Sequence, residues 1–156
     1  MSSLTRTAPP AIAGFYAAGA RAIDRLQPVF ALLVRLYVAR VFFLSGLTKL
    51  RDWHITRALF ENEFHVPLLP PELAAYLGTG AEIGLPILLA AGLGTRFAAA
   101  ALFVFNIVAV VSYPDLSDAG LKDHMLWGAL LLVSFVYGPG RWSADAFLSR
   151  SWPKGV

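Results

Sequence analysis

The sequence contains no cysteine and few charged residues, and these two absences narrow what the protein can be. Without cysteine the chain can build neither a disulfide framework nor a thiol redox shuttle nor a thiolate metal site. A redox role would therefore require a bound cofactor. Charged residues make up 15% of the 156 residues, the net charge is only +3, and the basic residues form no cluster, so we expect no nucleic-acid partner.

The motifs of several enzyme classes are absent as well. The chain has no H-E-x-x-H metalloprotease motif, no phosphate-binding P-loop, no nucleophile elbow and no dinucleotide-binding glycine pattern. A haem held between helices usually needs two axial ligands, yet only His124 falls within an expected membrane span. We therefore assign no catalytic residue and expect no metal site.

Apolar residues are abundant. They make up 57% of the chain, and the mean hydropathy of +0.61 is too high for an ordinary soluble domain of this size. About 20 apolar residues are needed to cross the hydrocarbon of a bilayer. Four stretches approach that length, at 28–50, 73–93, 96–113 and 124–138. The sequence thus predicts an all-α membrane protein, an antiparallel bundle of four transmembrane helices surrounded by the lipid bilayer.

The N-terminal residues 1–27 do not have the layout of a cleaved signal peptide, so we expect them to be retained. Apolar positions recur at helical spacing over 12–26, while Arg21, Asp24 and Arg25 fall together elsewhere. This pattern favours a helix lying in the membrane surface. A frayed leader is the alternative.

The remaining organisation follows from the loops and their charges. An amphipathic segment, 52–72, separates the first two spans, and a short C-terminal tail, 143–156, follows the membrane domain at 28–142. Because Lys and Arg are retained on the cytoplasmic side of short loops, we expect both termini to be cytoplasmic. The basic residues that would share that side are Arg6, Arg21, Arg25, Arg96, Arg141, Arg150 and Lys154.

Polar residues inside the expected spans need partners, since each charge near a helix centre costs about 2.5–3.5 kcal/mol on insertion. Arg40, Glu82 and Asn106 all lie about 15–18 Å from the cytoplasmic ends of their spans. We expect them to form one polar network. Arg35 lies about 7–8 Å nearer the cytoplasm, and it should either reach Glu82 or extend toward the surface. The alternative role for this network is an ion pair that only determines which helix faces meet.

A second polar layer is predicted near the opposite surface. The fourth span begins where the third ends, which places His124 and Trp127 at the depth of Lys49. Lys49 and Arg35 differ by 14 positions and so lie within about 40° of each other on the first helix, with Phe42 between them. The alternatives are that Lys49 extends to the interface and that His124 is an ordinary interfacial residue.

Three stretches of the sequence resemble the DoxX family of small four-helix bacterial membrane proteins. The opening stretch has that family's first-helix pattern, with Arg35, Ala39, Phe42, Gly46 and Lys49 at its spacing. The stretch "AEIGLPILLAAGLGTRFAAAAL" resembles its second and third helices, and "GPGRWSAD" resembles its ending. Two residues depart from the family's pattern: Ala39 replaces a usual Gly and Ala144 a usual Leu. In the second stretch the matching positions are Glu82, Gly92, Thr95 and Arg96. The resemblance runs from about residue 32 to residue 147.

This resemblance implies a bacterial inner-membrane protein. The family includes a subunit of thiosulfate:quinone oxidoreductase, relatives that associate with soluble redox or thiol-stress proteins, and others linked to metal stress. The resemblance therefore implies a subunit with a protein partner, and it supplies no established catalytic residue.

Three functional hypotheses follow. The first is a redox-associated subunit that holds a quinone, with Lys49, His124 and Trp127 beside Phe42 as the site and the Arg40–Glu82 layer carrying protons inward. The second is a non-catalytic anchor or assembly protein whose working surface is the segment 52–72. The apolar residues of that surface would be Trp53, Leu59, Phe60 and Phe64. The third is small-solute transport, which four helices could support only with homo-oligomerisation.

Overall fold

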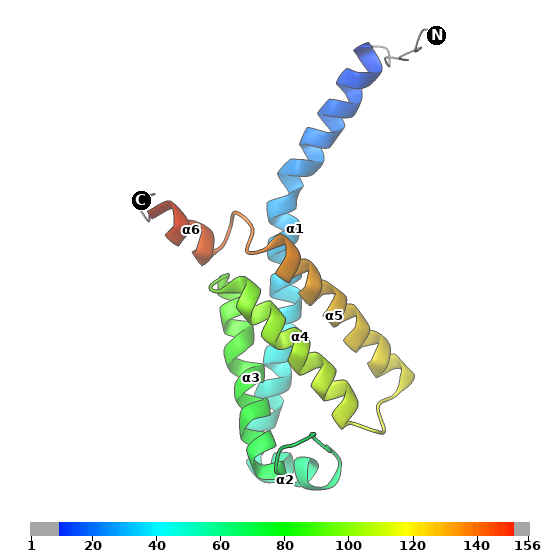
Figure 1. The fold of residues 1–156 in the computed structure, drawn as a ribbon, viewed down its shortest axis with the longest axis vertical. Helices are drawn as coiled ribbons and strands as arrows, with labels where there is room; N and C mark the ends of the chain where they lie inside the picture. The colour runs from blue at the N-terminus through cyan, green and yellow to red at the C-terminus, as the bar shows by residue number, and fades with distance from the viewer. Residues whose placement is uncertain (1–9, 152–156) are drawn as a thin grey trace, which may run out of the picture.

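The computed structural model describes residues 10–151, which form six α-helices and no strand (Figure 1). Four of these helices are long and apolar enough to cross a membrane. The all-α fold with four spans is therefore confirmed. The six helices are α1 (Pro10–Arg51), α2 (Trp53–Asn62), α3 (Pro71–Ala91), α4 (Thr95–Ser112), α5 (Asp118–Tyr137) and α6 (Ala144–Ser151).

The four long helices form a closed ring in which α1 and α4 each pack against both α3 and α5. Val38, Leu89, Leu102 and Leu131, one from each helix, are fully buried where the four meet. The outer faces of the four long helices remain apolar and uncovered, since a third or less of each candidate span is buried. Such a surface suits contact with lipid tails, not with water.

The first helix is longer than the sequence indicates. We expected a separate interfacial helix over 12–26 and a new helix from Pro28, but α1 continues through Pro28 without a break. Proline there removes a single hydrogen bond, to the carbonyl four residues earlier, and Pro28 is only partly buried. Figure 1 shows this N-terminal half of α1 projecting well beyond the bundle.

The segment between the first two spans folds back onto the bundle. Asp52 starts α2 by accepting a hydrogen bond from the backbone N–H of Ile55, at 3.0 Å. The helix then turns Phe60 inward onto α3, where this ring is only 6% exposed, and Trp53 and Phe64 pack around the same cluster. The expectation that Phe60 belongs to an outward docking surface is therefore wrong. Trp53, Leu59 and Phe64 are only partly buried.

The turn between α3 and α4, at the end of the bundle opposite α2, is tight. Gly92 and Gly94, at φ +70° and +56°, make the α3–α4 hairpin, as the short connection predicts. The fourth span starts earlier than expected, at Asp118, because the Ser117 hydroxyl accepts a hydrogen bond from the backbone N–H of Gly120 and caps the helix. The C-terminal tail contains a short helix, α6, that the sequence analysis did not anticipate.

Candidate functional site

An ion pair between Lys49 and Glu82 joins α1 to α3 near one end of the bundle. The Lys49 Nζ lies 2.6 Å and 2.8 Å from the two carboxylate oxygens. Gly46 makes this close approach possible, because a Cβ there would lie 2.8 Å from Ile83 Cδ1 and 3.0 Å from Glu82 Cβ. The two side chains are 17% and 7% exposed, so the pair is largely shielded.

Ser45 completes this polar group. Its hydroxyl donates to Glu82 Oε1 at 3.1 Å and accepts from Lys49 Nζ, also at 3.1 Å. The hydrogen-bond acceptors of Lys49 are thus the two Glu82 oxygens and Ser45 Oγ, all within the chain.

His124 is held by two hydrogen bonds to one residue on the neighbouring helix. The Asn106 side-chain amide donates to the backbone carbonyl of His124 at 3.0 Å, and Asn106 Oδ1 lies 2.7 Å from the ring Nδ1. Asn106 itself is buried. The expected contact of Asn106 with Arg40 and Glu82 is thus replaced by a contact with His124, in the second turn of α5.

Aromatic rings connect His124 to the middle of the bundle. The His124 and Trp127 rings meet edge to face with centroids 4.8 Å apart. Trp127 meets Phe42 in the same way at 5.9 Å, and Phe42 meets Phe105 at 6.2 Å. Such edge-to-face contacts hold rings in defined orientations.

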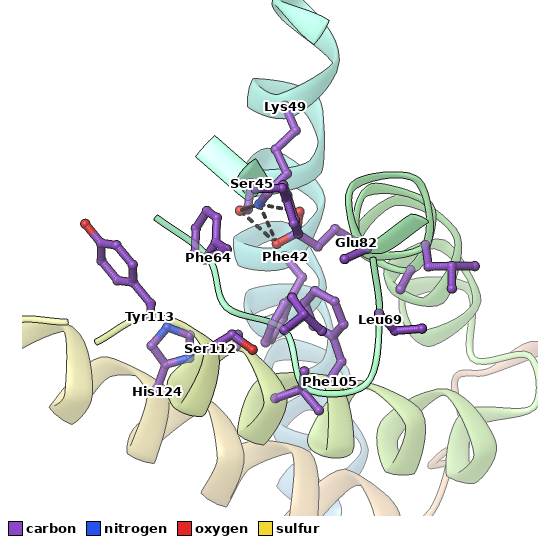
Figure 2. Close-up of a pocket in the computed structure, with 18 of the residues that line it drawn as sticks. Phe42, Ser45, Lys49, Phe64, Leu69, Glu82, Phe105, Ser112, Tyr113 and His124 are labelled. Atoms are coloured by element: carbon purple, nitrogen blue, oxygen red, sulfur yellow. Dashed lines mark hydrogen bonds and ion pairs between the residues drawn. The ribbon is translucent and has the colours of Figure 1, made fainter. Parts of the chain in front are cut away.

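These groups surround one cavity of about 500 Å³. All four residues predicted for a cofactor site, Lys49, His124, Trp127 and Phe42, line it. Figure 2 shows the ion pair on one wall, His124 on another, and the chain after α2 passing across the cavity. The wall is mostly apolar, and the cavity volume falls within the range of small-molecule sites. Its other lining residues include Ser45, Phe64, Leu69, Glu82, Phe105, Ser112 and Tyr113.

One buried polar atom in this wall is unsatisfied. Ser112 is 1% exposed, and its hydroxyl has no hydrogen-bond partner among the residues that the structure describes. Its backbone carbonyl accepts from the N–H of His65 at 2.8 Å, which ties the crossing segment to α4. A buried hydroxyl beside a cavity is the kind of group that a ligand would satisfy.

The predicted network of Arg40, Glu82 and Asn106 does not exist. Arg40 is exposed, and each of the other two has a different partner. Arg35 packs beside Gly92, at the C-terminal end of α3. On α1, therefore, residue 35 and not residue 28 lies at the level where α3 ends. Starting the span at residue 28 therefore placed Arg40 about 10 Å too deep.

Arg35 also does not reach Glu82. Its Nη2 donates to the backbone carbonyl of Trp142 at 2.6 Å, and the side chain is 1% exposed. Nearby, the Asp145 carboxylate caps α4 by accepting from the N–H groups of Gly94 and Thr95, at 2.8 Å and 2.9 Å. Burial raises the pKa of Asp145, but these hydrogen bonds and the charge of Arg35 outweigh it, and the pKa lies below its usual value.

The four spanning helices, with their apolar outer faces and buried charged groups, define an integral membrane protein. The DoxX family description matches residues 30–114, more than half of the chain, and the chain belongs to this family. It is similar to an uncharacterized protein of Haemophilus influenzae, at 30% identity over 134 residues that cover 80% of this chain and 87% of that protein. No solved structure matches the chain.

Sequence reasoning missed Ser45, Ser112 and the partner of Asn106. Ser45 could have been found, since it precedes Lys49 by one helical turn and faces the same neighbour. Ser112 and Asn106 carry no such local signal, because their surroundings depend on which residues of the neighbouring segments lie opposite.

Proposed function

We propose that the chain is a redox-associated subunit of a bacterial inner-membrane complex and holds a quinone-type carrier in the cavity beside Lys49 and Glu82. A partner protein performs the substrate chemistry, because the described residues include no group of three or more potential metal ligands and the sequence has no thiol. Both termini lie on the cytoplasmic side in this proposal, following the distribution of Lys and Arg.

The observation that carries the proposal is the cavity itself. The ring of a quinone or quinol needs an apolar slot and a few polar groups that meet its carbonyl oxygens or hydroxyls. The cavity provides both, with Phe42, Phe105 and Trp127 around the space and Glu82 and His124 at its wall. The hydroxyl of Ser112 adds a polar group that has no hydrogen-bond partner among the described residues.

Fluorescence titration tests the proposal. A variant in which Trp53, Trp142 and Trp152 are replaced by Phe keeps Trp127 as its single tryptophan. Trp127 lines the cavity, so its fluorescence reports on binding there. Titration of the purified protein in detergent with a short-tailed benzoquinone should quench Trp127 saturably. A linear, non-saturating response would contradict the proposal.

A pair of matched variants on α4 locates the binding. Val108 lines the cavity, whereas Val104, one turn away, is 60% exposed and lies outside it. Val108→Phe should reduce the affinity at least tenfold by filling the space, and Val104→Phe should leave it unchanged. Equal effects of the two substitutions would show that the quinone binds elsewhere.

A second candidate, the assembly role, is favoured by the projecting half of α1. Phe15, Tyr16, Ile23 and Leu26 are all more than 60% exposed there, and no other described element covers them. An extended apolar helix of this kind suits contact with a partner subunit or a second copy. Deletion of residues 2–27 should then reduce the apparent mass of the native complex and leave quinone binding intact. A complex of unchanged mass would count against this role.

A further inference from the structure

We propose that the cavity selects the reduced, dihydroxy form of its carrier over the oxidised quinone, and that Asn106 is the positioning residue for this preference. The inference rests on the proposed function and specifies the ligand of the same site. It follows from the direction of each hydrogen bond around the cavity, since a quinone oxygen can only accept and a quinol hydroxyl can also donate.

Asn106 determines which ring nitrogen of His124 carries the proton. A backbone carbonyl can only accept, so the nitrogen of the Asn106 amide must be the atom that faces the carbonyl of His124, at 3.0 Å. Asn106 Oδ1 is then the atom 2.7 Å from the ring, and it too can only accept. The proton of the neutral imidazole is therefore on Nδ1.

The position of this proton determines which group His124 offers to the cavity. A neutral imidazole with its proton on Nδ1 has a lone pair and no proton on Nε2. His124 lines the cavity, and its Nδ1 is already used by Asn106. The group that His124 can offer to a ligand is therefore an acceptor. A ligand hydroxyl satisfies it, and a quinone carbonyl does not.

The ion pair of Lys49 and Glu82 lies on the other wall of the cavity. Lys49 Nζ donates to both oxygens of Glu82 and to Ser45 Oγ. Glu82 Oε1 accepts from both of those residues, whereas Oε2 accepts from Lys49 alone. A carboxylate oxygen has two lone pairs, so Oε2 retains one. This wall, too, offers a ligand an acceptor.

The remaining polar groups do not reverse this balance. The hydroxyls of Ser112 and Tyr113 either donate or accept, so they serve both forms of the carrier. The indole N–H of Trp127 is a donor and suits one oxygen of either form. An oxidised ring would leave Nε2 of His124 unpaired and would not use the free lone pair of Glu82 Oε2, whereas the two hydroxyls of a quinol can donate to both.

Three probes that share one decyl tail test the preference. They are a benzoquinone, its hydroquinone and the dimethyl ether of that hydroquinone, titrated anaerobically against Trp127 fluorescence with dithionite present for the hydroquinone. The reductant alters no protein group, because the chain has no cysteine. The hydroquinone should bind about tenfold more tightly than the other two, as expected for one buried acceptor that is satisfied instead of left unpaired.

Two measurements separate the role of Asn106 from simple loss of structure. Histidine-selective ¹⁵N NMR should show the Nδ1–H form of His124, identified by the loss of its signals in His124→Phe, and a mixture of forms in Asn106→Leu. Asn106→Leu should also reduce the tenfold preference to less than threefold. If Asn106→Leu fails to fold, the NMR spectrum of the unaltered protein still tests the inference, and a proton on Nε2 would overturn it. The affinities of His124→Phe for the probes provide a second test.

The outcomes also distinguish this inference from the proposed function. If none of the three probes binds saturably, the proposed function fails and the preference fails with it. If the benzoquinone binds as tightly as the hydroquinone or more tightly, the quinone-type site stands and only the preference is overturned. Tight binding of the dimethyl ether would likewise overturn it, because that probe has no hydroxyl.

Discussion

Lys49 and Arg35 are both shielded cations on the same face of α1, yet their surroundings differ. Arg35 is held against backbone, with its Nη2 on the carbonyl of Trp142 and its Nη1 beside Gly92, and it does not line the cavity beside Lys49. Lys49 is paired with Glu82 at the wall of a cavity of about 500 Å³. A buried charge is therefore not by itself a sign of a ligand site. The space next to it decides.

The largest change in stability is expected when the ion pair of Lys49 and Glu82 is disrupted. Lys49→Met leaves the Glu82 carboxylate, 7% exposed, without its counter-charge. Loss of one partner of a buried pair destabilises a protein by about 3 kcal/mol or more. We expect a decrease of this size in the free energy of unfolding, measured by denaturation in detergent micelles.

Two controls accompany this substitution. The double variant Lys49→Met, Glu82→Gln removes both charges and should recover most of the lost stability. Arg57→Met breaks the exposed contacts of Arg57 with Glu61 and Glu72, at 3.8 Å and 3.6 Å, and should change stability by less than about 1 kcal/mol. A double variant no more stable than the single one would show that the pair is not a coupled unit.

The Arg35 end is tested next by Gly92→Ala. Gly92 has φ +70°, and a Cβ there would collide with Arg35 Nη1 and with Ser143. Strained backbone and overpacking together should lower the free energy of unfolding by about 2–3 kcal/mol.

Gly94→Ala is the matched control for this substitution. Gly94 also has a positive φ, +56°, but a Cβ there would meet nothing within 4 Å. Its effect should be limited to the backbone term, about 1 kcal/mol. Equal losses for the two glycines would mean that the packing of Arg35 and Ser143 around Gly92 contributes nothing.

The smallest effect is expected for Asp145, which caps α4. Asp145→Ala should destabilise the protein by about 1 kcal/mol through loss of its bonds to the N–H groups of Gly94 and Thr95. Asp145→Asn, which keeps one accepting oxygen, should lose less. Thermal unfolding at neutral pH measures both.

The same carboxylate predicts a dependence on acid. Because hydrogen bonds to backbone N–H groups lower the pKa of Asp145 in the folded state, its contribution is complete above the ordinary Asp value of about 3.9. That contribution is lost as the pH falls through the lower, folded value. The stability difference between the unaltered protein and Asp145→Asn should therefore shrink below pH about 4. A difference independent of pH would contradict this role.

Much of the candidate site could be predicted from the sequence. The 14-position spacing of Arg35 and Lys49 correctly placed both on the inner face of α1 with Phe42 between them. The order of the spans correctly brought His124 and Trp127 to the cavity that Lys49 lines. These predictions hold because helical periodicity and alternating span direction act over one helix or one turn.

The partners of the buried charges could not be predicted in the same way. Glu82 was assigned to Arg40 because their distances from assumed span ends agreed. The error came from the start of α1, which runs far beyond the bundle, so no local feature near Pro28 indicates where the membrane part begins. An error of two turns in one helix changes which residue lies opposite.

The sequence alone determined the helical class, the four spans and the end of the bundle at which polar and aromatic residues gather. The tertiary structure decided the pairing of Lys49 with Glu82, the bonds between Asn106 and His124, and the separate position of Arg35. The physical reason is that hydrophobic length and periodicity are properties of one segment. The relative level of two helices depends on close packing, as at Gly46 against Ile83, and that packing exists only in the assembled bundle.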